Sequence, residues 1–369
     1  MVNAAVVGYG HAGRHFHAYL IGLADGLNFY AVASRNAKRR ESAAQEYPGV
    51  KLYETIDRMI ADDGVDLVVL ATPHDTHADL AIQAMNAGKH VVTDKIMCMN
   101  AQEADAMVEA SRRNDVLLSV FHNRRWDWDF LTVKKVIEDG LLGIPYLFQV
   151  AIMRYGAPPG WRGVKKQSGG ILYDYPAHLV DQALLLVRSP VKTVFCDIHD
   201  GGHWNTDIGN YANLLMKFEN GVRYQIEIGN SARAEKARWY ILGDLGGLVK
   251  YGLDPQEQPM AAGNIDAAEE DPKNYARVWT GEGERELIVE SVRGSWKSYY
   301  ENISDVLNYR AELIVKPEAT KETETAVLSA LDSQWKDLKR EIQEFSEEAT
   351  RSSIEWAQEI VEDWRRRLS

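Results

Sequence analysis

The chain has 369 residues, and its 54 acidic against 42 basic side chains give a formal net charge of −12. An acidic chain lacks the basic face that non-specific nucleic-acid binding needs, so we expect no nucleic-acid partner. The two cysteines, Cys98 and Cys196, are too few for a disulfide scaffold or a cysteine-rich metal site. No apolar run approaches the ~20 residues of a membrane helix. We therefore expect a cytoplasmic globular protein of about two domains, with no membrane partner.

The N-terminal part of the chain alternates short apolar strands with helices. The expected strands are residues 4–7, 29–33, 50–53, 66–71, 90–93 and 117–120, and the expected helices are residues 12–23, 37–46, 55–61, 77–87 and 101–113. Continuous apolar strands separated by helices indicate a parallel sheet that is covered on both faces. The pattern predicts an α/β, doubly wound Rossmann domain over residues 1–121.

After residue 121 the strands become longer and several of them alternate. The expected strands are residues 146–153, 191–198, 211–218, 222–228 and 238–242, with a hairpin signal at Asn220-Gly221. This pattern predicts an α+β domain over residues 122–330, built on a large, mostly antiparallel open sheet. Apolar residues at steps of three and four in the last part predict a C-terminal helical extension over residues 331–369.

A glycine motif follows the first expected strand. Gly8, Gly10 and Gly13 form G-x-G-x-x-G, with His11 and Ala12 between the last two glycines. The motif follows a strand and opens a helix, which is the context that supports dinucleotide binding. The first glycine makes a tight turn, the second lets the backbone approach a pyrophosphate, and the third lets the helix pack on the strand. The pyrophosphate is expected on the N–H groups of the helix start.

The end of the second strand bears on which dinucleotide binds. NAD sites place an acidic residue about 20 residues after the glycines, where it holds a ribose hydroxyl. Residues 33–39 contain no acid and instead carry Ser34, Arg35 and Arg39. A serine and an arginine can bind a phosphate, and arginine can also stack on adenine. The sequence therefore favours NADP as the cofactor, with NAD as the alternative.

Two later groups of residues are suited to chemistry. Asp94 and Lys95 follow the fifth expected strand, at the sheet edge where ligands of such folds bind. A lysine there can hold a substrate hydroxyl or favour developing negative charge on oxygen. Asp174 and His178 are four residues apart, so they share one face of a helix, and histidine is suited to proton transfer near neutral pH. A metal site of Asp174, His178 and Asp181 is a weaker alternative, so we predict no metal.

The chain resembles the glucose–fructose oxidoreductase, inositol dehydrogenase and MocA (Gfo/Idh/MocA) family over about residues 3–330. The resemblance rests on G-Y-G-H-A-G at 8–13, A-T-P-H-D-T-H at 71–77, T-D-K at 93–95, H-N-R-R-W-D at 122–127 and G-G-I-L-Y-D-Y-P-A-H at 169–178. Similarity to its NADP-dependent scyllo-inositol dehydrogenase branch rests on D-W-D-F-L-T-V-K-K at 127–135 and L-V-K-Y-G-L-D-P-Q-E at 248–257.

The resemblance implies roles for individual residues. It implies that His178 is the acid/base, that Lys95 positions the substrate hydroxyl and that Asp174 completes the catalytic set. The residues implied on the nicotinamide side of the cofactor site are Thr72, Pro73 and His77, with Asp94 and Lys95 beside them. Those implied on the substrate side are Asn123, Arg124, Trp161 and Arg162, with Asp174 and His178. The resemblance also implies a homodimer or homotetramer formed through the C-terminal sheet.

The sequence departs from the family pattern at two places. The usual E-K-P is Asp94-Lys95-Ile96, which lacks the proline that often carries a cis bond. Tyr175 stands where the family usually has a glycine after the aspartate of the helix motif. These changes leave Lys95 and His178 in place but alter the residues around the substrate.

We therefore expect an oxidoreductase that transfers a hydride between a nicotinamide and a secondary alcohol of a cyclic polyol, sugar or sugar derivative. One alternative is a redox-neutral glycoside or sugar lyase or hydrolase that reduces a bound NAD only transiently. Another is a non-catalytic ligand sensor on a dehydrogenase scaffold, because fold alone does not decide function.

Overall fold

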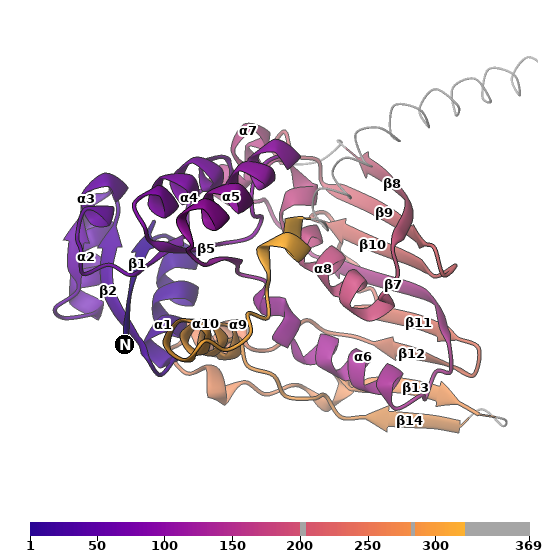
Figure 1. Cartoon of the computed structure of the whole chain (residues 1–369). Helices are drawn as coiled ribbons and strands as arrows, with labels where there is room; N and C mark the ends of the chain where they lie inside the picture. Colours follow the sequence, from indigo (N-terminus) through magenta and orange to yellow (C-terminus); the bar gives the residue numbers. More distant parts are fainter. Residues whose placement is uncertain (200–203, 282–284, 322–369) are drawn as a thin grey trace, which may run out of the picture.

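The computed structural model describes residues 1–199, 204–281 and 285–321 of the chain. Within these ranges the chain forms two sheets with their own helices, side by side in the molecule (Figure 1). The helical extension expected at residues 331–369 lies outside the described residues. No helix in the described ranges is both long and apolar enough to span a membrane.

The first sheet has six strands in the order β3-β2-β1-β4-β5-β6, and all neighbouring strands are parallel. Its strands are β1 (Val2–Val7), β2 (Leu27–Ala33), β3 (Lys51–Tyr53), β4 (Leu67–Leu70), β5 (His90–Thr93) and β6 (Leu118–Val120). Its helices are η1 (Ala12–Ala18), α1 (Tyr19–Leu23), α2 (Ala37–Glu46), α3 (Ile56–Ile60), η2 (His74–Thr76), α4 (His77–Asn86) and α5 (Ala101–Asn114). This is the strand order of the Rossmann fold, and the predicted doubly wound domain is confirmed.

Both faces of this sheet are buried, because successive side chains of a strand point to opposite sides. In β1, Ala4 and Val6 pack with Leu20 of α1, whereas Ala5 and Val7 pack with the helices α4 and α5 on the other side. All four strand residues are 7% exposed or less. This burial accounts for the continuous apolar character of the strand.

A late segment of the chain completes the first domain. Helix α10 (Lys297–Tyr309) lies against α1 (Figure 1), and the hydroxyl of its buried Tyr300 is 2.7 Å from Nδ1 of His17 in η1. The hydroxyl of Ser304 bonds to the turn before β2. The domain limits expected from the sequence place this helix in the second domain, at 122–330, whereas the elements that it packs on are α1 and β1 of the first. Its amphipathic pattern does not reveal which domain its apolar face contacts.

The second sheet has eight strands in the order β14-β13-β12-β11-β7-β10-β9-β8. They are β7 (Pro145–Met153), β8 (Val191–His199), β9 (Tyr211–Phe218), β10 (Arg223–Gly229), β11 (Trp239–Gly243), β12 (Gly246–Lys250), β13 (Ala276–Thr280) and β14 (Arg285–Val289). Only the central pair, β7 and β10, is parallel, so the expected mostly antiparallel sheet is confirmed. The last three strands, β12 to β14, were not expected from the sequence, and β12 begins with two glycines, which are rare in strands.

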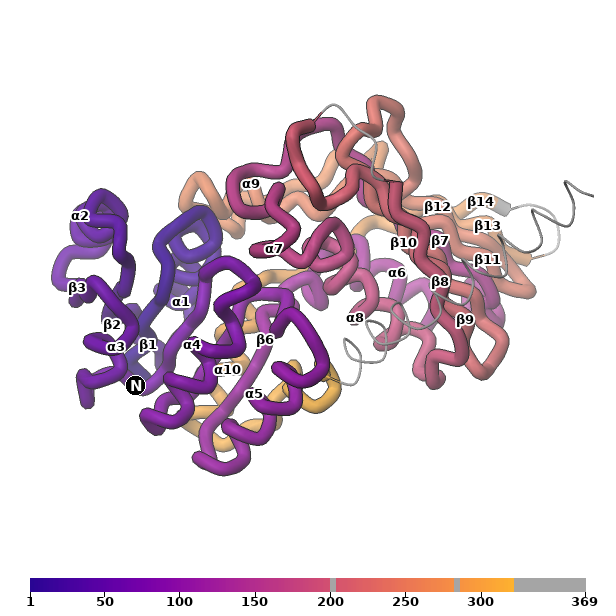
Figure 2. Tube along the Cα trace, turned by 90° about the horizontal axis from the view of Figure 1, so that it is seen from above, coloured from indigo at the N-terminus to yellow at the C-terminus, as the bar shows by residue number. Residues whose placement is uncertain are grey.

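Helices cover one face of the second sheet, and the described residues leave the other face uncovered. Helices α6 (Trp128–Glu138) and α8 (Tyr175–Val187) lie across the covered face (Figures 1 and 2), where they share one apolar core with inward residues of the strands. The remaining short helices of this half are η3 (Asn123–Trp126), η4 (Gly160–Gly163), α7 (Lys165–Ser168), η5 (Ile171–Tyr173), α9 (Glu257–Ala261), η6 (Ile265–Ala267) and η7 (Pro272–Asn274). The Asn220-Gly221 turn joins β9 to β10 as expected, although only Gly221 has a positive φ, of 89°.

Candidate active site

The three glycines of the N-terminal motif meet three different constraints. Gly8 has a φ of +91°, and a Cβ there would lie 2.4 Å from the carbonyl oxygen of Ala71. A Cβ at Gly13 would lie 1.9 Å from the carbonyl oxygen of Gly8, so the helix can approach the strand only without a side chain. A Cβ at Gly10 would meet nothing closer than the Arg39 guanidinium at 3.7 Å. Gly10 therefore leaves open space in front of the backbone, as a bound pyrophosphate would need.

A cavity of about 520 Å³ lies along the carboxyl ends of β1, β2 and β4. The sequence-predicted cofactor residues that line it are Gly8, Gly10, His11, Ala12, Ser34, Arg35, Arg39, Thr72, Pro73 and Asp94. The helix after the glycines begins at Ala12, and the first N–H groups of a helix have no partner within it. The cavity size, the glycine cradle and these N–H groups fit a nicotinamide dinucleotide.

Some lining residues of this cavity differ from the sequence expectation. Trp161, expected on the substrate side, lines the dinucleotide cavity, and Glu54 and Asp57 line it without having been predicted. Gly13, His77 and Lys95, also predicted for the cofactor site, are not among the lining residues. The fully buried His77 ring places one nitrogen 2.7 Å from the Ile96 carbonyl oxygen and the other 3.1 Å from that of Thr72. His77 therefore links the backbone after β4, at Thr72, to the backbone after β5, at Ile96.

A second cavity of about 240 Å³ adjoins the first. His11, Ala12, Asp94 and Arg162 line both cavities, so the two lie side by side. The other sequence-predicted residues that line it are Lys95, Asn123, Arg124, Asp174 and His178. The structure thus brings the T-D-K turn after β5, the η3 segment and the start of α8 together at one point. This arrangement makes the second cavity the candidate substrate pocket.

Lys95 and Asp174 form an ion pair at the floor of this pocket. Lys95 directly follows the turn after β5, its side chain is 11% exposed, and the Lys95–Ile96 peptide bond is cis. Asp174 is the residue before α8, so the helix start fixes its position. Burial acts to raise the pKa of Asp174, but the charges of Lys95 and Arg162 outweigh it and hold that pKa well below its usual range. Asp174 is therefore an anion that orients the ammonium of Lys95.

His178 lies in the first turn of α8 and is 4% exposed. Burial, reinforced by the charge of Lys95, lowers the pKa of His178 well below its usual range, so the imidazole is neutral at physiological pH. Its Nδ1 has no hydrogen-bond partner in the part of the chain that the structure describes. The neighbouring His122 ring lies edge-on at a centroid distance of 5.6 Å, and burial lowers the pKa of His122 to about 4. A neutral imidazole in the pocket can accept a proton from a substrate hydroxyl.

Two contacts fix α8 to η3, the segment that follows β6, the last strand of the first sheet, after two residues. The Asp181 carboxylate accepts hydrogen bonds of 2.8 and 2.6 Å from Nε and Nη2 of Arg125. The side-chain amide of the next residue, Gln182, donates to the Arg124 carbonyl oxygen at 2.7 Å. Both carboxylate oxygens of Asp181 are thus bound by Arg125, in a buried contact that we call the clamp. The alternative considered from the sequence had Asp181 as a metal ligand. The clamp sets the position of His178 relative to Lys95, which belongs to the other domain.

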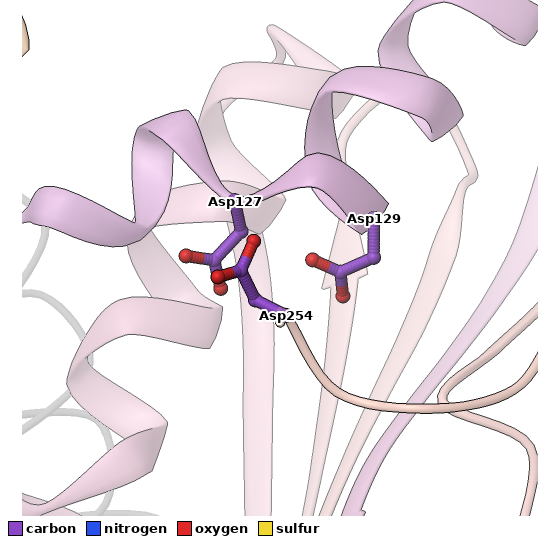
Figure 3. A group of neighbouring side chains, drawn as sticks. All are labelled: Asp127, Asp129 and Asp254. Atoms are coloured by element: carbon purple, nitrogen blue, oxygen red, sulfur yellow. The ribbon is translucent and has the colours of Figure 1, made fainter. Parts of the chain in front are cut away.

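Behind the pocket lies a buried group of three carboxylates, Asp127, Asp129 and Asp254 (Figure 3). Protein donors bind each of them: Arg124 and Trp296 donate to Asp127, Trp239 donates to Asp129, and the backbone N–H of Trp128 and the side chain of Gln256 donate to Asp254. Burial raises the pKa of Asp127 well above its usual range and that of Asp254 to about 6. Asp127 is the member of the group that contacts the pocket lining, because its Oδ2 accepts a hydrogen bond of 2.9 Å from Nη1 of Arg124.

Sequence reasoning missed four polar residues of the substrate pocket, namely His17, Arg154, Tyr175 and Glu257. Arg154 follows β7 directly, in a sheet predicted to be mostly antiparallel, so nothing in the sequence placed it in the pocket. Tyr175 had been noted only as a departure from the family pattern. His17 reaches the pocket with its Nε2 at 3.9 Å from Oδ2 of Asp94. The other ring nitrogen of His17 contacts Tyr300 of α10, which is 283 positions away, so no local pattern indicated where this side chain lies.

Comparison with known proteins agrees with this geometry. Residues 2–122 match the model of an oxidoreductase family with an NAD-binding Rossmann fold, and residues 130–249 match the model of the Gfo/Idh/MocA C-terminal domain. The scyllo-inositol 2-dehydrogenase (NADP(+)) IolW of Bacillus subtilis is 32% identical over 328 residues, which are 86% of this chain and 89% of that protein. The uncharacterized oxidoreductase YdgJ of Escherichia coli is 35% identical over 319 residues, or 83% of this chain and 89% of the relative.

Solved structures show the same arrangement. The oxidoreductase yvaA of Bacillus subtilis superposes with a TM-score of 0.83 at 28% identity, covering 91% of this chain and 97% of that one. An oxidoreductase of Klebsiella pneumoniae superposes with a TM-score of 0.79 at 32% identity, covering 89% and 91%. The two family models together cover most of both domains, over residues 2–122 and 130–249. The chain therefore belongs to the Gfo/Idh/MocA family of NAD(P)-binding oxidoreductases.

Proposed function

We propose that this chain is an NADP-dependent dehydrogenase or reductase that acts on a secondary alcohol of a cyclic polyol, sugar or sugar derivative. The observation that carries the proposal is the pocket that joins the Lys95–Asp174 pair and the neutral His178 to the dinucleotide cavity. The relative named scyllo-inositol 2-dehydrogenase (NADP(+)) supports both the reaction class and the cofactor. The polar lining of the pocket suits a hydroxyl-rich substrate, because buried hydroxyls need partners.

The residues of the pocket divide the work in this proposal. When bound, the nicotinamide supplies a hydride acceptor or donor at its ring. Lys95, oriented by Asp174, donates a hydrogen bond to the reacting oxygen and stabilises negative charge that develops there. His178 takes the hydroxyl proton during oxidation and returns it during reduction. His178 is 4% exposed and the Lys95 side chain is 11% exposed, so both groups meet little solvent.

The choice of NADP rests on the end of β2. Ser34, Arg35 and Arg39 line the dinucleotide cavity, and Asn36 caps α2 there by accepting from the backbone N–H of Arg39. These donors suit a ribose phosphate, since a charge-assisted hydrogen bond strengthens binding by about 10- to 100-fold. Tighter binding of NADPH than NADH by at least about 10-fold, lost in Arg35→Asp, is the expected result. Equal affinities would contradict the NADP assignment.

A spectrophotometric screen tests the proposed activity. Inositols, aldoses and anhydrosugars are incubated with the full chain and NAD or NADP in parallel, and nicotinamide absorbance is followed together with substrate consumption. Oxidation of at least one polyol with NADP supports the proposal. Substrate loss without a net absorbance change points instead to redox-neutral chemistry, and no reaction across the panel points to a sensor.

We also propose that two copies of the chain associate through the uncovered face of the second sheet. That face exposes large apolar side chains, among them Leu215 of β9 (41% exposed), Tyr240 of β11 (36%) and Ile288 of β14 (69%). Light scattering should give the mass of a dimer or tetramer, and Leu215→Lys should shift it towards the monomer. A monomeric wild type would contradict this proposal.

A further inference from the structure

The substrate pocket carries more positive than negative side chains. Lys95, Arg124, Arg154 and Arg162 line it, against the three carboxylates of Asp94, Asp174 and Glu257. The four cations differ in how far the protein already neutralises them. Lys95 pairs with Asp174, and Arg124 lies 4.0 Å from the Glu257 carboxylate on the pocket side besides its hydrogen bond to Asp127. The excess charge therefore lies with the remaining two arginines.

Arg154 is distinguished from Arg162 by its place. Arg162 lines both cavities, so it is within reach of a dinucleotide, whereas Arg154 lines the substrate pocket alone. The carboxylate oxygen nearest to Arg154 is Oδ2 of Asp174, 3.8 Å from its Nη2, and that carboxylate already pairs with Lys95. Among the described residues Arg154 has no carboxylate within hydrogen-bond distance. Its terminal N–H groups are available to a ligand.

The guanidinium of Arg154 is nevertheless held in one orientation. Its Nε donates to Oδ1 of Asn230 at 3.0 Å, and Asn230 is only 2% exposed. Its Cζ lies 5.0 Å from the centroid of the Tyr175 ring, and Cζ of Arg124 lies 5.2 Å from the same ring. A ring and a buried amide thus fix the plane of the fork, which reduces the entropy lost when a ligand binds.

We propose that the substrate is a monocyclic sugar or polyol derivative that carries a carboxylate, and that Arg154 binds this carboxylate. The inference rests on the proposed function and names its substrate class. A planar carboxylate matches the two parallel N–H groups of a guanidinium and neutralises the excess charge, which an uncharged polyol does not. The cavity of about 240 Å³ lies below the ~300–1,000 Å³ of pockets for drug-sized ligands, which favours a single ring.

The experiment compares acids with their uncharged counterparts. Turnover of glucuronate and glucose, and of galacturonate and galactose, is measured with NADP on the full chain, with a hexose phosphate as a third anionic arm. The variants are Arg154→Gln, which keeps an amide donor but loses the charge, and Arg154→Lys, which keeps the charge without the fork. The control is Arg188→Gln, because Arg188 is 73% exposed at the far end of α8.

The wild type should prefer an acid over its neutral partner by about 10-fold or more in kcat/KM, mainly through KM. Arg154→Gln should lower kcat/KM for the acid by about 10- to 100-fold and abolish the preference, Arg154→Lys should restore part of it, and the control should keep it. An acid that is no better than its neutral partner, a preference for the hexose phosphate instead, or a preference that survives Arg154→Gln overturns the inference.

Calorimetric titration of the same ligands into NADP-loaded protein separates this inference from the proposed activity. Acid binding that depends on Arg154, without any turnover, supports the binding site and refutes the proposed redox function. Turnover of neutral sugars together with no Arg154-dependent acid binding supports the redox function and refutes the inference.

Discussion

Replacement of Lys95 by methionine should remove most of the catalytic rate while the fold and the dinucleotide cavity stay intact. The ammonium is 11% exposed, so water screens it weakly. At an effective dielectric constant near 20, a unit charge about 4 Å from a developing charge contributes about 4 kcal/mol. Pairing with Asp174 takes up part of this, which leaves about 3 kcal/mol, or a loss of about 10²-fold in kcat.

Lys89 offers a matched control for this substitution. It stands just before the other end of β5, is 9% exposed, and donates to the Asp62 carbonyl oxygen at 3.2 Å. Lys89→Met should lower stability without a comparable loss of kcat, whereas Lys95→Met should lower kcat and leave the Kd for NADPH within about threefold. Steady-state kinetics and a fluorescence titration of the cofactor measure both quantities. Near-wild-type turnover of Lys95→Met would refute the role of this residue.

Three further predictions concern the elements that support the pocket. Asp181→Asn leaves the buried Arg125 without its ion pair, so it should lower the free energy of unfolding by about 3–5 kcal/mol and the Tm by about 6–20 °C. A smaller Tm shift than that of Asp139→Asn, which breaks the exposed Lys135–Asp139 pair, would contradict the clamp. Burial raises the pKa of Asp254 from 3.8 to about 6, so the folded state loses stability as pH rises through about 6. Relative to the wild type, Asp254→Asn should therefore gain about 3 kcal/mol in the free energy of unfolding between about pH 4 and pH 7, and a pH-independent difference in urea unfolding would count against this. His178→Gln should lower kcat by about 10²-fold at all pH values near neutrality, because burial keeps the native imidazole neutral there; an unchanged rate would remove His178 from the mechanism.

The first domain could be predicted closely because its signals are local. Strands such as β4 are apolar throughout, since both faces of a parallel sheet are buried. Gly13 packs on the backbone of Gly8, and Gly8 itself has a φ of +91°, so the spacing of these glycines indicates the turn. The place of Lys95 at the end of β5 also follows from topology, because the carboxyl ends of parallel strands meet at one edge.

The features that the sequence did not predict depend mostly on contacts between residues far apart in the chain. Helix α10 joins the first domain through contacts such as Tyr300 with His17, which are separated by 283 positions. Arg154 reaches the pocket because β7 pairs in parallel with β10 and Asn230 then binds its guanidinium. Nothing in the residues around position 154 encodes that pairing. The edge strand β14 is short and charged, which is typical of sheet edges and gives a weak strand signal.

The most direct test of the central claim follows the hydrogen of the reacting carbon. The best substrate of the screen is labelled with deuterium at each carbinol carbon in turn, oxidised with NADP by the full chain, and the reduced cofactor is analysed by mass spectrometry. The account predicts that one labelled position transfers its deuterium to the nicotinamide ring without loss to water. Deuterium that appears in solvent, or stays in the substrate while the cofactor is unchanged, would contradict hydride transfer at this site.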